Sequence, residues 1–283
     1  MHARKKSVIL KIAAVAALLI LAHQTIYEDL RPTIRKMYFL HIRGTPLIKE
    51  VPRTIVDCNS VISSDTMVAL VLGQSNSANF GNKRNSTDRP VYSFYEGSCY
   101  QAIDPMPGAD GDGGSVWPLV GDSLIKNGRY KSVVFITIGV SSSSVARWAP
   151  GGDLHKNIID SWRGVKSIGL TITHVLWHQG EEDMLLKTPR NNYYKSLKSV
   201  IDSTRSAGIS APFYIATASY CGGQFSESVT SAQTTIVNKV ENTFAGPNTD
   251  QIVGATDRYD QCHLTAAGMD KFSDAWVSSL LHH

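Results

Sequence analysis

The sequence lacks a surplus of charge outside its amino terminus. Its 283 residues carry 28 Lys and Arg against 24 Asp and Glu, a formal net charge of +4. Residues 1–36 contain seven of the basic and two of the acidic residues, which leaves 21 basic and 22 acidic residues in the remaining chain. A body this close to neutral has no electrostatic footprint for nucleic acid. We therefore expect no nucleic-acid partner.

Long hydrophobic runs are also missing. The longest uninterrupted apolar run, residues 12–22, has 11 residues, whereas a membrane-spanning helix needs about 20 and a signal peptide about 7–15. Three basic residues at positions 4–6 precede this run, which is the charge order of an export signal. Residues 1–22 are therefore predicted to be a signal peptide, or a short N-terminal transmembrane anchor if Lys11 snorkels to the interface. Both alternatives place the body outside the cytoplasm, in a periplasmic, secreted or lumenal location.

Close pairs of metal ligands are absent as well. The four cysteines are far apart, unlike the paired ligands of structural zinc sites. His174 and His178 have the spacing of a zinc pair, but their segment is predicted to be a strand and no Glu follows His174 as in the zincin motif. The acidic stretch 104–114 does not have the spacing of an EF-hand loop. We expect no metal site.

The four cysteines fit an oxidising compartment, where two disulfides can form with three possible pairings. The favoured pairing is Cys221 with Cys262, since both follow predicted strands near the expected site, and this leaves Cys58 with Cys99. Buried free thiols are the alternative.

From residue 65 to residue 283, short apolar runs alternate with amphipathic segments. The strand candidates are apolar on both faces, as buried parallel strands are: 67–72, 133–140, 172–177, 213–219 and 252–255. The helix candidates lie between them: 118–126, 154–166, 190–206, 227–244 and 266–281. This alternation predicts one α/β domain with a mostly parallel sheet. Residues 23–64, which carry three prolines and little periodicity, are predicted to be a spacer.

In such sheets the chemistry lies at the carboxyl ends of the strands. Ser75 follows the first strand, after a glycine that permits a tight turn and exposes the hydroxyl. A turn of small residues, 139–144, follows the second strand and can point backbone N–H groups into a cleft. Gln179 follows the third strand and could donate its amide to the same cleft. Each feature alone is weak, because serine after a strand is most often a helix cap.

Asp260 and His263 stand three residues apart, just before the last predicted helix. A carboxylate against one imidazole nitrogen fixes the tautomer and leaves the other nitrogen free to accept a serine proton. Together with Ser75 these residues supply every part of a hydrolytic site, in the chain order Ser, Asp, His.

At these residues the sequence resembles the SGNH (GDSL-like) hydrolase superfamily, and more narrowly its branch of sialate O-acetylesterases and carbohydrate acetylesterases. That branch carries GQSN, WHQGE and D-x-x-H-L-T-x-x-G blocks, which match residues 73–76, 177–181 and 260–268. Its Gly-Ser-x-Trp-Pro segment matches residues 114–118. The resemblance covers roughly residues 66–280.

The resemblance implies a three-layer α/β/α sandwich with a flavodoxin-like sheet, and a hydrolase that needs no metal or organic cofactor. Ser75 would be the nucleophile, His263 the general base and acid, and Asp260 the residue that orients His263. The oxyanion hole would use the Ser75 N–H, the Gln179 side chain and a backbone N–H from the serine run.

Two assignments remain open within this resemblance. The family usually has Gly-Gly-Thr-Ser where this chain has four serines, so the backbone donor is Ser141 or, as we favour, Ser142, provided that its φ is allowed for a residue with a Cβ. The candidate substrate-binding residues are Gln74, Asn76, Arg147 and Glu181.

The predicted function is an extracytoplasmic serine esterase that removes O-acetyl groups from a glycan or polysaccharide through an acyl-serine intermediate. A polysaccharide O-acetyltransferase that uses the same triad is the first alternative. A non-catalytic glycan-binding protein on a hydrolase fold is the second, although the complete triad counts against it. A membrane would be a further partner if the N-terminal segment stays uncleaved.

Overall fold

The computed structural model describes residues 51–282, so the predicted signal or anchor at 1–22 and most of the predicted spacer lie outside the described residues. The strands are β1 (Ile55–Val56), β2 (Thr66–Gly73), β3 (Val91–Tyr95), β4 (Ser98–Gln101), β5 (Ser132–Thr137), β6 (His174–His178), β7 (Phe213–Thr217) and β8 (Thr243–Asn248). The α-helices are α2 (Trp117–Lys126), α3 (Val145–Trp148), α4 (His155–Ser167), α5 (Glu181–Leu185), α6 (Arg190–Ser206), α7 (Glu227–Lys239) and α8 (Ala266–Leu281). Short 3₁₀ helices are η2 (Cys58–Val61), η3 (Ser75–Ser77) and η4 (Thr249–Gln251).

The strands form one eight-stranded sheet in the order β1-β4-β3-β5-β2-β6-β7-β8. The six strands from β3 to β8 in this order pair in parallel, while β4 is antiparallel to both of its neighbours. Numbered along the chain, β2, β5, β6, β7 and β8 have the order 2-1-3-4-5, which is the flavodoxin-like arrangement. The predicted mostly parallel α/β fold is confirmed, with β3, β4 and β1 added beyond β5.

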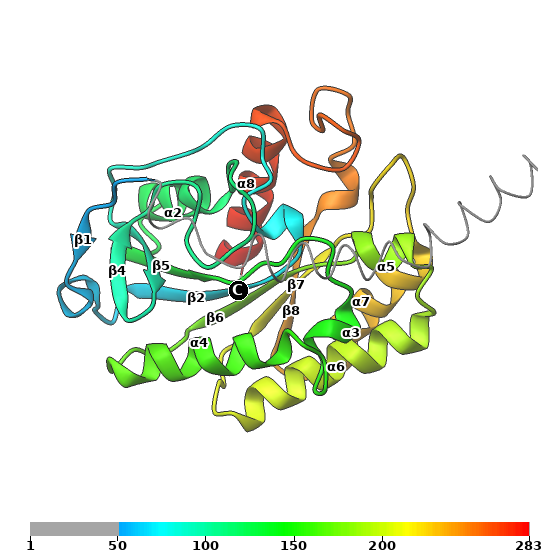
Figure 1. The fold of residues 1–283 in the computed structure, drawn as a ribbon, viewed down its shortest axis with the longest axis horizontal. Helices are drawn as coiled ribbons and strands as arrows, with labels where there is room; N and C mark the ends of the chain where they lie inside the picture. Colours follow the sequence, from blue (N-terminus) through cyan, green and yellow to red (C-terminus); the bar gives the residue numbers. More distant parts are fainter. Residues whose placement is uncertain (1–50, 283) are drawn as a thin grey trace, which may run out of the picture. The chain divides into compact units, whose positions relative to one another are not determined.

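Helices cover both faces of the sheet and make the fold three layers thick (Figure 1). One core lies between the sheet and helices α2 and α8, and the other between the sheet and helices α3, α4, α6 and α7. Each fully buried Val, Leu or Met side chain contributes about 1.5–3 kcal/mol, and β2 supplies such residues to both cores. The side chains of Val68, Leu70 and Leu72 enter one core, and those of Met67, Ala69 and Val71 the other. This two-sided burial explains the continuous apolar run.

The carboxy-terminal part of the sheet differs from the prediction. Residues 252–255 form no strand; the last strand is β8, and the helix predicted to reach residue 244 ends at Lys239. β8 was not predicted because it contains Gly246 and Pro247, and both residue types are depleted in strands. They are tolerated here because β8 is the edge strand and pairs only with β7, and a Cβ at Gly246 would lie 2.8 Å from the Ala216 nitrogen.

The opposite edge of the sheet includes residues assigned to the spacer. Ile55 and Val56 pair with β4, and Cys58 in η2 forms a disulfide with Cys99 of β4. Val61 and Ile62 pack against the core. The folded body therefore begins on the amino-terminal side of residue 65.

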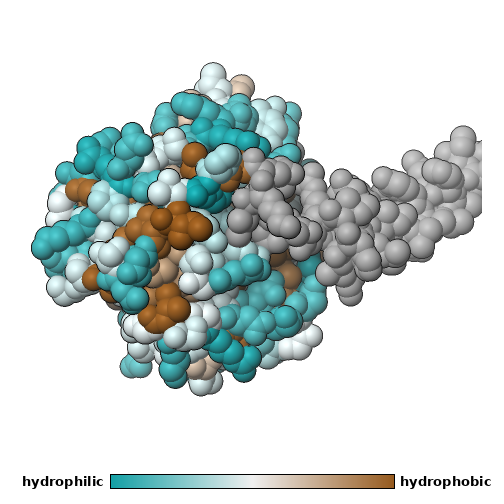
Figure 2. Space-filling model, turned by 60° about the vertical axis from the view of Figure 1, so that its left-hand side comes forward, coloured by the Kyte–Doolittle hydropathy of each residue, from teal (hydrophilic) through white to brown (hydrophobic). Residues whose placement is uncertain are grey.

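The surface on the side where β1 and β4 lie is mostly hydrophilic, with several hydrophobic patches (Figure 2). Such mixed surfaces are usual for folded domains. Among residues 51–282, no helix is both long and apolar enough to cross a membrane.

A buried carboxyl group lies in the loop between β4 and α2. Asp104 is 2% exposed. Its Oδ2 accepts the backbone N–H groups of Asn85 and Ser115 at 2.8 and 2.7 Å, and its Oδ1 accepts the Ser115 hydroxyl at 2.6 Å. Burial raises the pKa of Asp104 to about 7, although these hydrogen bonds and the nearby Arg53 act in the opposite direction.

We expect Asp104 to contribute a fall in the free energy of unfolding as the pH rises from about 4 to about 7. In this window the folded protein holds a proton on Asp104 that the unfolded chain has released, so rising pH favours unfolding. The difference between the folded pKa of about 7 and the ordinary Asp pKa of about 3.9 sets an upper limit of about 4 kcal/mol on this loss. In urea unfolding at several pH values, the free energy of unfolding of the wild type relative to that of Asp104→Asn should therefore fall as the pH rises through this window. Equal slopes for the two proteins would contradict the assignment.

Candidate active site

The turn after β2 presents Ser75 at the carboxyl end of the sheet. Gly73 ends the strand with φ at +142°, and a Cβ there would lie 1.9 Å from the carbonyl oxygen of His178 in β6. Glycine alone lets β2 and β6 run this close and lets the chain turn sharply. Ser75 then begins η3 and is 3% exposed. In a flavodoxin-like sheet, the position between β2 and β6 is the topological switch point, where ligands bind.

Asp260 and His263 form the hydrogen-bonded pair that the sequence predicted. Asp260 Oδ2 lies 2.6 Å from His263 Nδ1, and its Oδ1 accepts the backbone N–H groups of Cys262 and His263 at 2.9 and 2.6 Å. Burial alone would raise the Asp260 pKa, but the hydrogen bonds from His263 outweigh it and the pKa lies below its ordinary value. An ionised Asp260 holds the proton of His263 on Nδ1, which leaves Nε2 as the acceptor.

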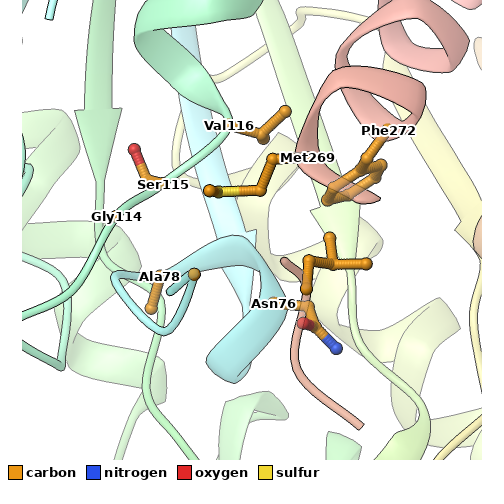
Figure 3. A pocket seen from close by; sticks show the side chains of 9 residues that line it. Asn76, Ala78, Gly114, Ser115, Val116, Met269 and Phe272 are labelled. Atoms are coloured by element: carbon orange, nitrogen blue, oxygen red, sulfur yellow. The ribbon is translucent and has the colours of Figure 1, made fainter. Parts of the chain in front are cut away.

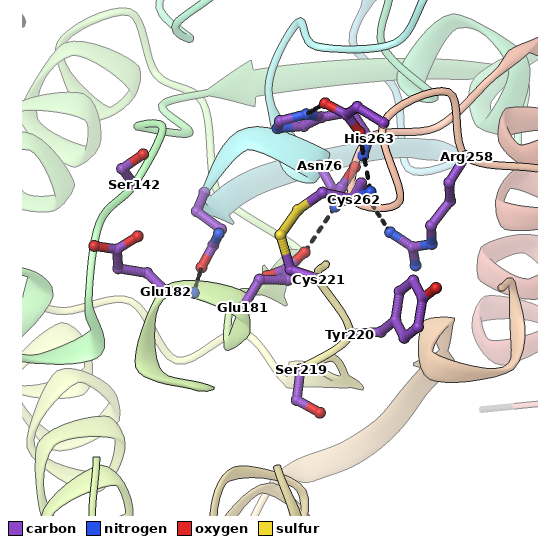
Figure 4. The surroundings of a disulfide bond; sticks show 12 residues. Asn76, Ser142, Glu181, Glu182, Ser219, Tyr220, Cys221, Arg258, Cys262 and His263 are labelled. Atoms are coloured by element: carbon purple, nitrogen blue, oxygen red, sulfur yellow. Dashed lines mark hydrogen bonds and ion pairs between the residues drawn. A yellow bond between two sulfur atoms is a disulfide. The ribbon is translucent and has the colours of Figure 1, made fainter. Parts of the chain in front are cut away.

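The residue after Ser75 contacts the residue before His263. The Asn76 side chain donates to the carbonyl oxygen of Cys262 at 3.2 Å and to Glu181 Oε1 at 2.8 Å (Figure 4). Consecutive Cα atoms are about 3.8 Å apart. This single hydrogen bond therefore brings Ser75 and His263 together at the carboxyl ends of the strands.

Cys262 is also held by a disulfide and by a buried arginine (Figure 4). It is bonded to Cys221, and with Cys58–Cys99 both predicted pairings are confirmed. Arg258, 5% exposed, donates to the Cys262 carbonyl oxygen and to the Thr249 and Ile252 carbonyl oxygens at 2.9 and 2.6 Å. Arg258 was not predictable from the sequence, because a lone Arg in a loop gives no sign that its acceptors are carbonyl groups.

The candidate substrate-binding residues all have partners within the protein. Gln74 Oε1 accepts the backbone N–H groups of Gly180 and Glu182 at 3.3 and 3.1 Å, at the start of α5. Glu181, 2% exposed, accepts from Asn76 as described, and Arg147 pairs with Asp153 at 2.8 Å. The first three of these contacts fasten the turn after β2 to the turn after β6.

The Gln179 side chain is directed into the protein. It is fully buried, and its Nε2 donates to Asp183 Oδ2 at 2.6 Å and to the Ser143 carbonyl oxygen at 3.0 Å. Both amide hydrogens therefore have acceptors within the protein, in contrast to the free donor that an oxyanion hole requires. Asp183 accepts the Val145 N–H as well, so Gln179 and Asp183 together hold the serine-rich turn.

The serine-rich turn contains one residue in the left-handed region. Ser142 has φ at +53°, a conformation usual for glycine and costly for most other residues. The backbone N–H of Ser141 donates to Asp110 Oδ2 at 3.1 Å. Of the two candidate donors, Ser142 is thus the one that has the backbone conformation of a glycine.

Comparison with known protein families identifies the domain that carries this site. A family model described as carbohydrate esterase, sialic acid-specific acetylesterase, matches residues 65–282. The chain belongs to this family. It is accordingly a hydrolase of carboxylic esters, and the resemblance found in the sequence is confirmed. No curated protein sequence matches the chain.

Solved structures share the fold of this esterase. One is a protein from Arabidopsis thaliana, with a TM-score of 0.63 and 16% identity over 77% of this chain and 98% of the other. NanS has a TM-score of 0.53 and 14% identity over 78% and 98%. A carbohydrate esterase of family 3 from Talaromyces cellulolyticus has a TM-score of 0.51 and 11% identity over 76% and 97%. At these identities the similarity concerns the fold alone.

A small cavity lies between η3 and α8 of the esterase (Figure 3). Asn76, Met269 and Phe272 line it together with Gly114 and Ser115, and its volume is about 10 Å³. This is about the space that one water molecule needs, so the cavity is too small for the acyl group of a substrate. Within residues 51–282, no group of three or more His, Cys, Asp or Glu could hold a metal ion.

Gly73→Ala should destabilise the esterase by about 3 kcal/mol, because the new methyl group overlaps a backbone carbonyl that has no room to retreat. Gly164→Ala in α4 is the matched control. Its Cβ meets nothing closer than a Phe94 ring carbon at 3.7 Å, so this change should stabilise the helix by about 0.5–1 kcal/mol. Urea unfolding of both variants tests the pair. Similar stabilities would show that β2 and β6 can separate without cost.

Proposed function

We propose that this esterase removes O-acetyl groups from carbohydrates by a serine mechanism. Ser75 is the nucleophile, His263 the general base and acid, and Asp260 the residue that orients His263. The supporting observation is the Asp260–His263 pair, whose loop is hydrogen-bonded through Cys262 to the residue that follows Ser75.

In the first step, His263 Nε2 takes the Ser75 hydroxyl proton while Oγ attacks the acetyl carbonyl carbon. His263 then gives this proton to the sugar oxygen, which leaves as a hydroxyl group, and acetyl-Ser75 remains. Water hydrolyses that ester in the second step, with His263 again as base, and releases acetate. The ionised Asp260 stabilises the imidazolium that forms in each step.

The proposed oxyanion donors are the backbone N–H groups of Ser75 and Ser142. Backbone donors fixed before the reaction stabilise the developing negative charge without reorganisation. Gln179 would contribute indirectly, since its bond to the Ser143 carbonyl oxygen holds the turn that carries Ser142.

Acetate release by the full-length protein tests the proposal. The substrates are 4-nitrophenyl acetate and an O-acetylated oligosaccharide, and a phosphonate ester that reacts with activated serines serves as a covalent label. We expect acetate from both substrates and the label on the peptide that contains Ser75. A protein that releases no acetate, or carries the label elsewhere, would contradict this function. Acetyl transfer to an added sugar in place of release would indicate the transferase alternative.

We also propose that the protein works outside the cytoplasm. Two disulfides indicate an oxidising compartment, and the basic and apolar order of residues 4–22 is that of an export signal. Fractionation of cells should recover the protein in the medium or in the periplasmic or lumenal fraction, apart from cytosolic marker enzymes. Recovery with the cytosolic markers would contradict the location.

A further inference from the structure

Two aromatic rings stack on the imidazole of His263. The Phe80 ring centroid lies 5.3 Å from that of His263 and the Tyr259 ring centroid 5.9 Å, with interplanar angles of 25° and 26°. Phe80 is partly buried, whereas Tyr259 is 50% exposed. A single exposed aromatic residue needs no functional explanation by itself, but this one adjoins the general base.

Tyr259 is fixed at both ends. Its backbone N–H donates to the His263 carbonyl oxygen at 3.0 Å, and its hydroxyl donates to the Phe80 carbonyl oxygen at 3.1 Å. Burial, followed by the charges of Asp260 and Asp112, raises the pKa of the hydroxyl, which therefore keeps the proton for this bond. A ring held in this way loses little side-chain freedom when a ligand covers it.

The reaction brings the sugar to this ring. The sugar oxygen is the leaving group, and His263 must return a proton to it over about 2.6–3.2 Å. The sugar carbons begin one bond beyond that oxygen, whereas the acetyl group lies toward Ser75. A ring that is stacked on the imidazole and half open to solvent is therefore a candidate surface for the sugar. The C–H groups on one face of a pyranose are apolar and weakly positive, and they complement the negative face of an aromatic ring.

We propose that Tyr259 is a sugar-binding residue, and that its exposed ring is the surface on which the pyranose carrying the acetyl ester stacks. The inference rests on the proposed function, because it is the ester's sugar oxygen that receives the proton from His263. The ligand class is an O-acetylated pyranoside.

Two acetate esters with different leaving groups test the proposal on the full-length protein. One is an O-acetylated methyl pyranoside, and the other is methyl acetate, whose methanol is too short to cover the ring. Tyr259→Leu keeps an apolar side chain but removes the flat face. We expect it to lower kcat/KM about tenfold for the pyranoside, mainly through KM, and to change it less than about twofold for methyl acetate. Tyr259→Phe keeps the ring and should stay within about threefold of the wild type on both esters.

Phe225→Leu is the matched control. Phe225 is about as exposed as Tyr259, at 57%, but the ring that it packs against is Tyr220, with the two ring centroids 4.9 Å apart. This variant should therefore hydrolyse both esters like the wild type. Equal losses on both esters in Tyr259→Leu would show that Tyr259 acts on His263, and would overturn the sugar contact. No loss on either ester would also overturn it. If the wild type hydrolyses neither ester, or Ser75→Ala still hydrolyses the pyranoside, the proposed function itself fails.

Discussion

Ser75→Ala should lower kcat/KM for acetate release by at least about 10⁴-fold while the protein stays folded. The change removes one hydroxyl oxygen from a residue that is 3% exposed, so the packing around η3 changes little. No acyl-enzyme can form without that oxygen, and what remains is the stabilisation that the oxyanion donors provide. Acetate release and thermal unfolding of the same preparation give the measurement.

Three further variants sharpen this test. His263→Ala should lose about as much activity as Ser75→Ala, and the double variant should lose little more, because the two residues act as one unit. Ser77→Ala is the serine control, since Ser77 lies in the same 3₁₀ helix and its hydroxyl donates to the Gln74 carbonyl oxygen. It should stay within about tenfold of the wild type and lose about 1 kcal/mol of stability. Ester hydrolysis by Ser75→Ala at the Ser77→Ala rate would refute the nucleophile.

Removing the Cys221–Cys262 disulfide should lower both stability and turnover, whereas removing Cys58–Cys99 should lower stability alone. Both bridges join cysteines 41 positions apart, so the loop-closure model gives each the same stabilisation, about 4 kcal/mol. Only Cys262 adjoins His263, the proposed general base, and a shift of a catalytic group by about 1 Å costs on the order of 10²-fold in rate. We expect kcat to fall about 10- to 100-fold in Cys221→Ala/Cys262→Ala and to stay within about threefold in Cys58→Ala/Cys99→Ala.

The equal loop lengths make this comparison informative. Denaturant unfolding and kcat are measured on both double variants at a temperature where each is folded. Equal losses of kcat would show that the disulfides act only through overall stability. Unchanged kcat in both would show that Asn76 and Arg258 hold the His263 loop without help from the bridge.

The parts of the fold that were predictable are those fixed by local chemistry. α6 and α8 have the bounds expected from the sequence, Arg190–Ser206 and Ala266–Leu281. Pro189 precedes the first helix, and Thr265 caps the second by accepting the Gly268 N–H at 3.2 Å. The hairpin of β3 and β4 was missed. Both central residues of its turn, Glu96 and Gly97, have positive φ, and Glu at the first position is not the Asn or Asp that marks such turns.

In the candidate site, too, the residues fixed by local chemistry were predictable and the others were not. Asp260 and His263 were recognisable because a three-residue spacing alone can bring them together. The direction of Gln179 depends on a partner distant in the sequence, the Ser143 carbonyl oxygen 36 positions away. The carbonyl acceptors of Arg258 lie only 4 to 9 positions away, but in loops without a regular pattern. Side-chain direction at such residues follows from the path of several loops, which no local pattern encodes.

The hydrogen bond from Asn76 to Cys262 spans 186 positions of sequence, and this separation has a consequence for folding. His263, the proposed general base, joins Ser75, the proposed nucleophile, only when the segment before α8 docks. Contacts of such long range form late and slowly. The thiols of Cys221 and Cys262 must also be oxidised to form their disulfide. During refolding, recovery of esterase activity should therefore lag behind the recovery of secondary structure, and hydrolysis becomes a reporter of the last docking step.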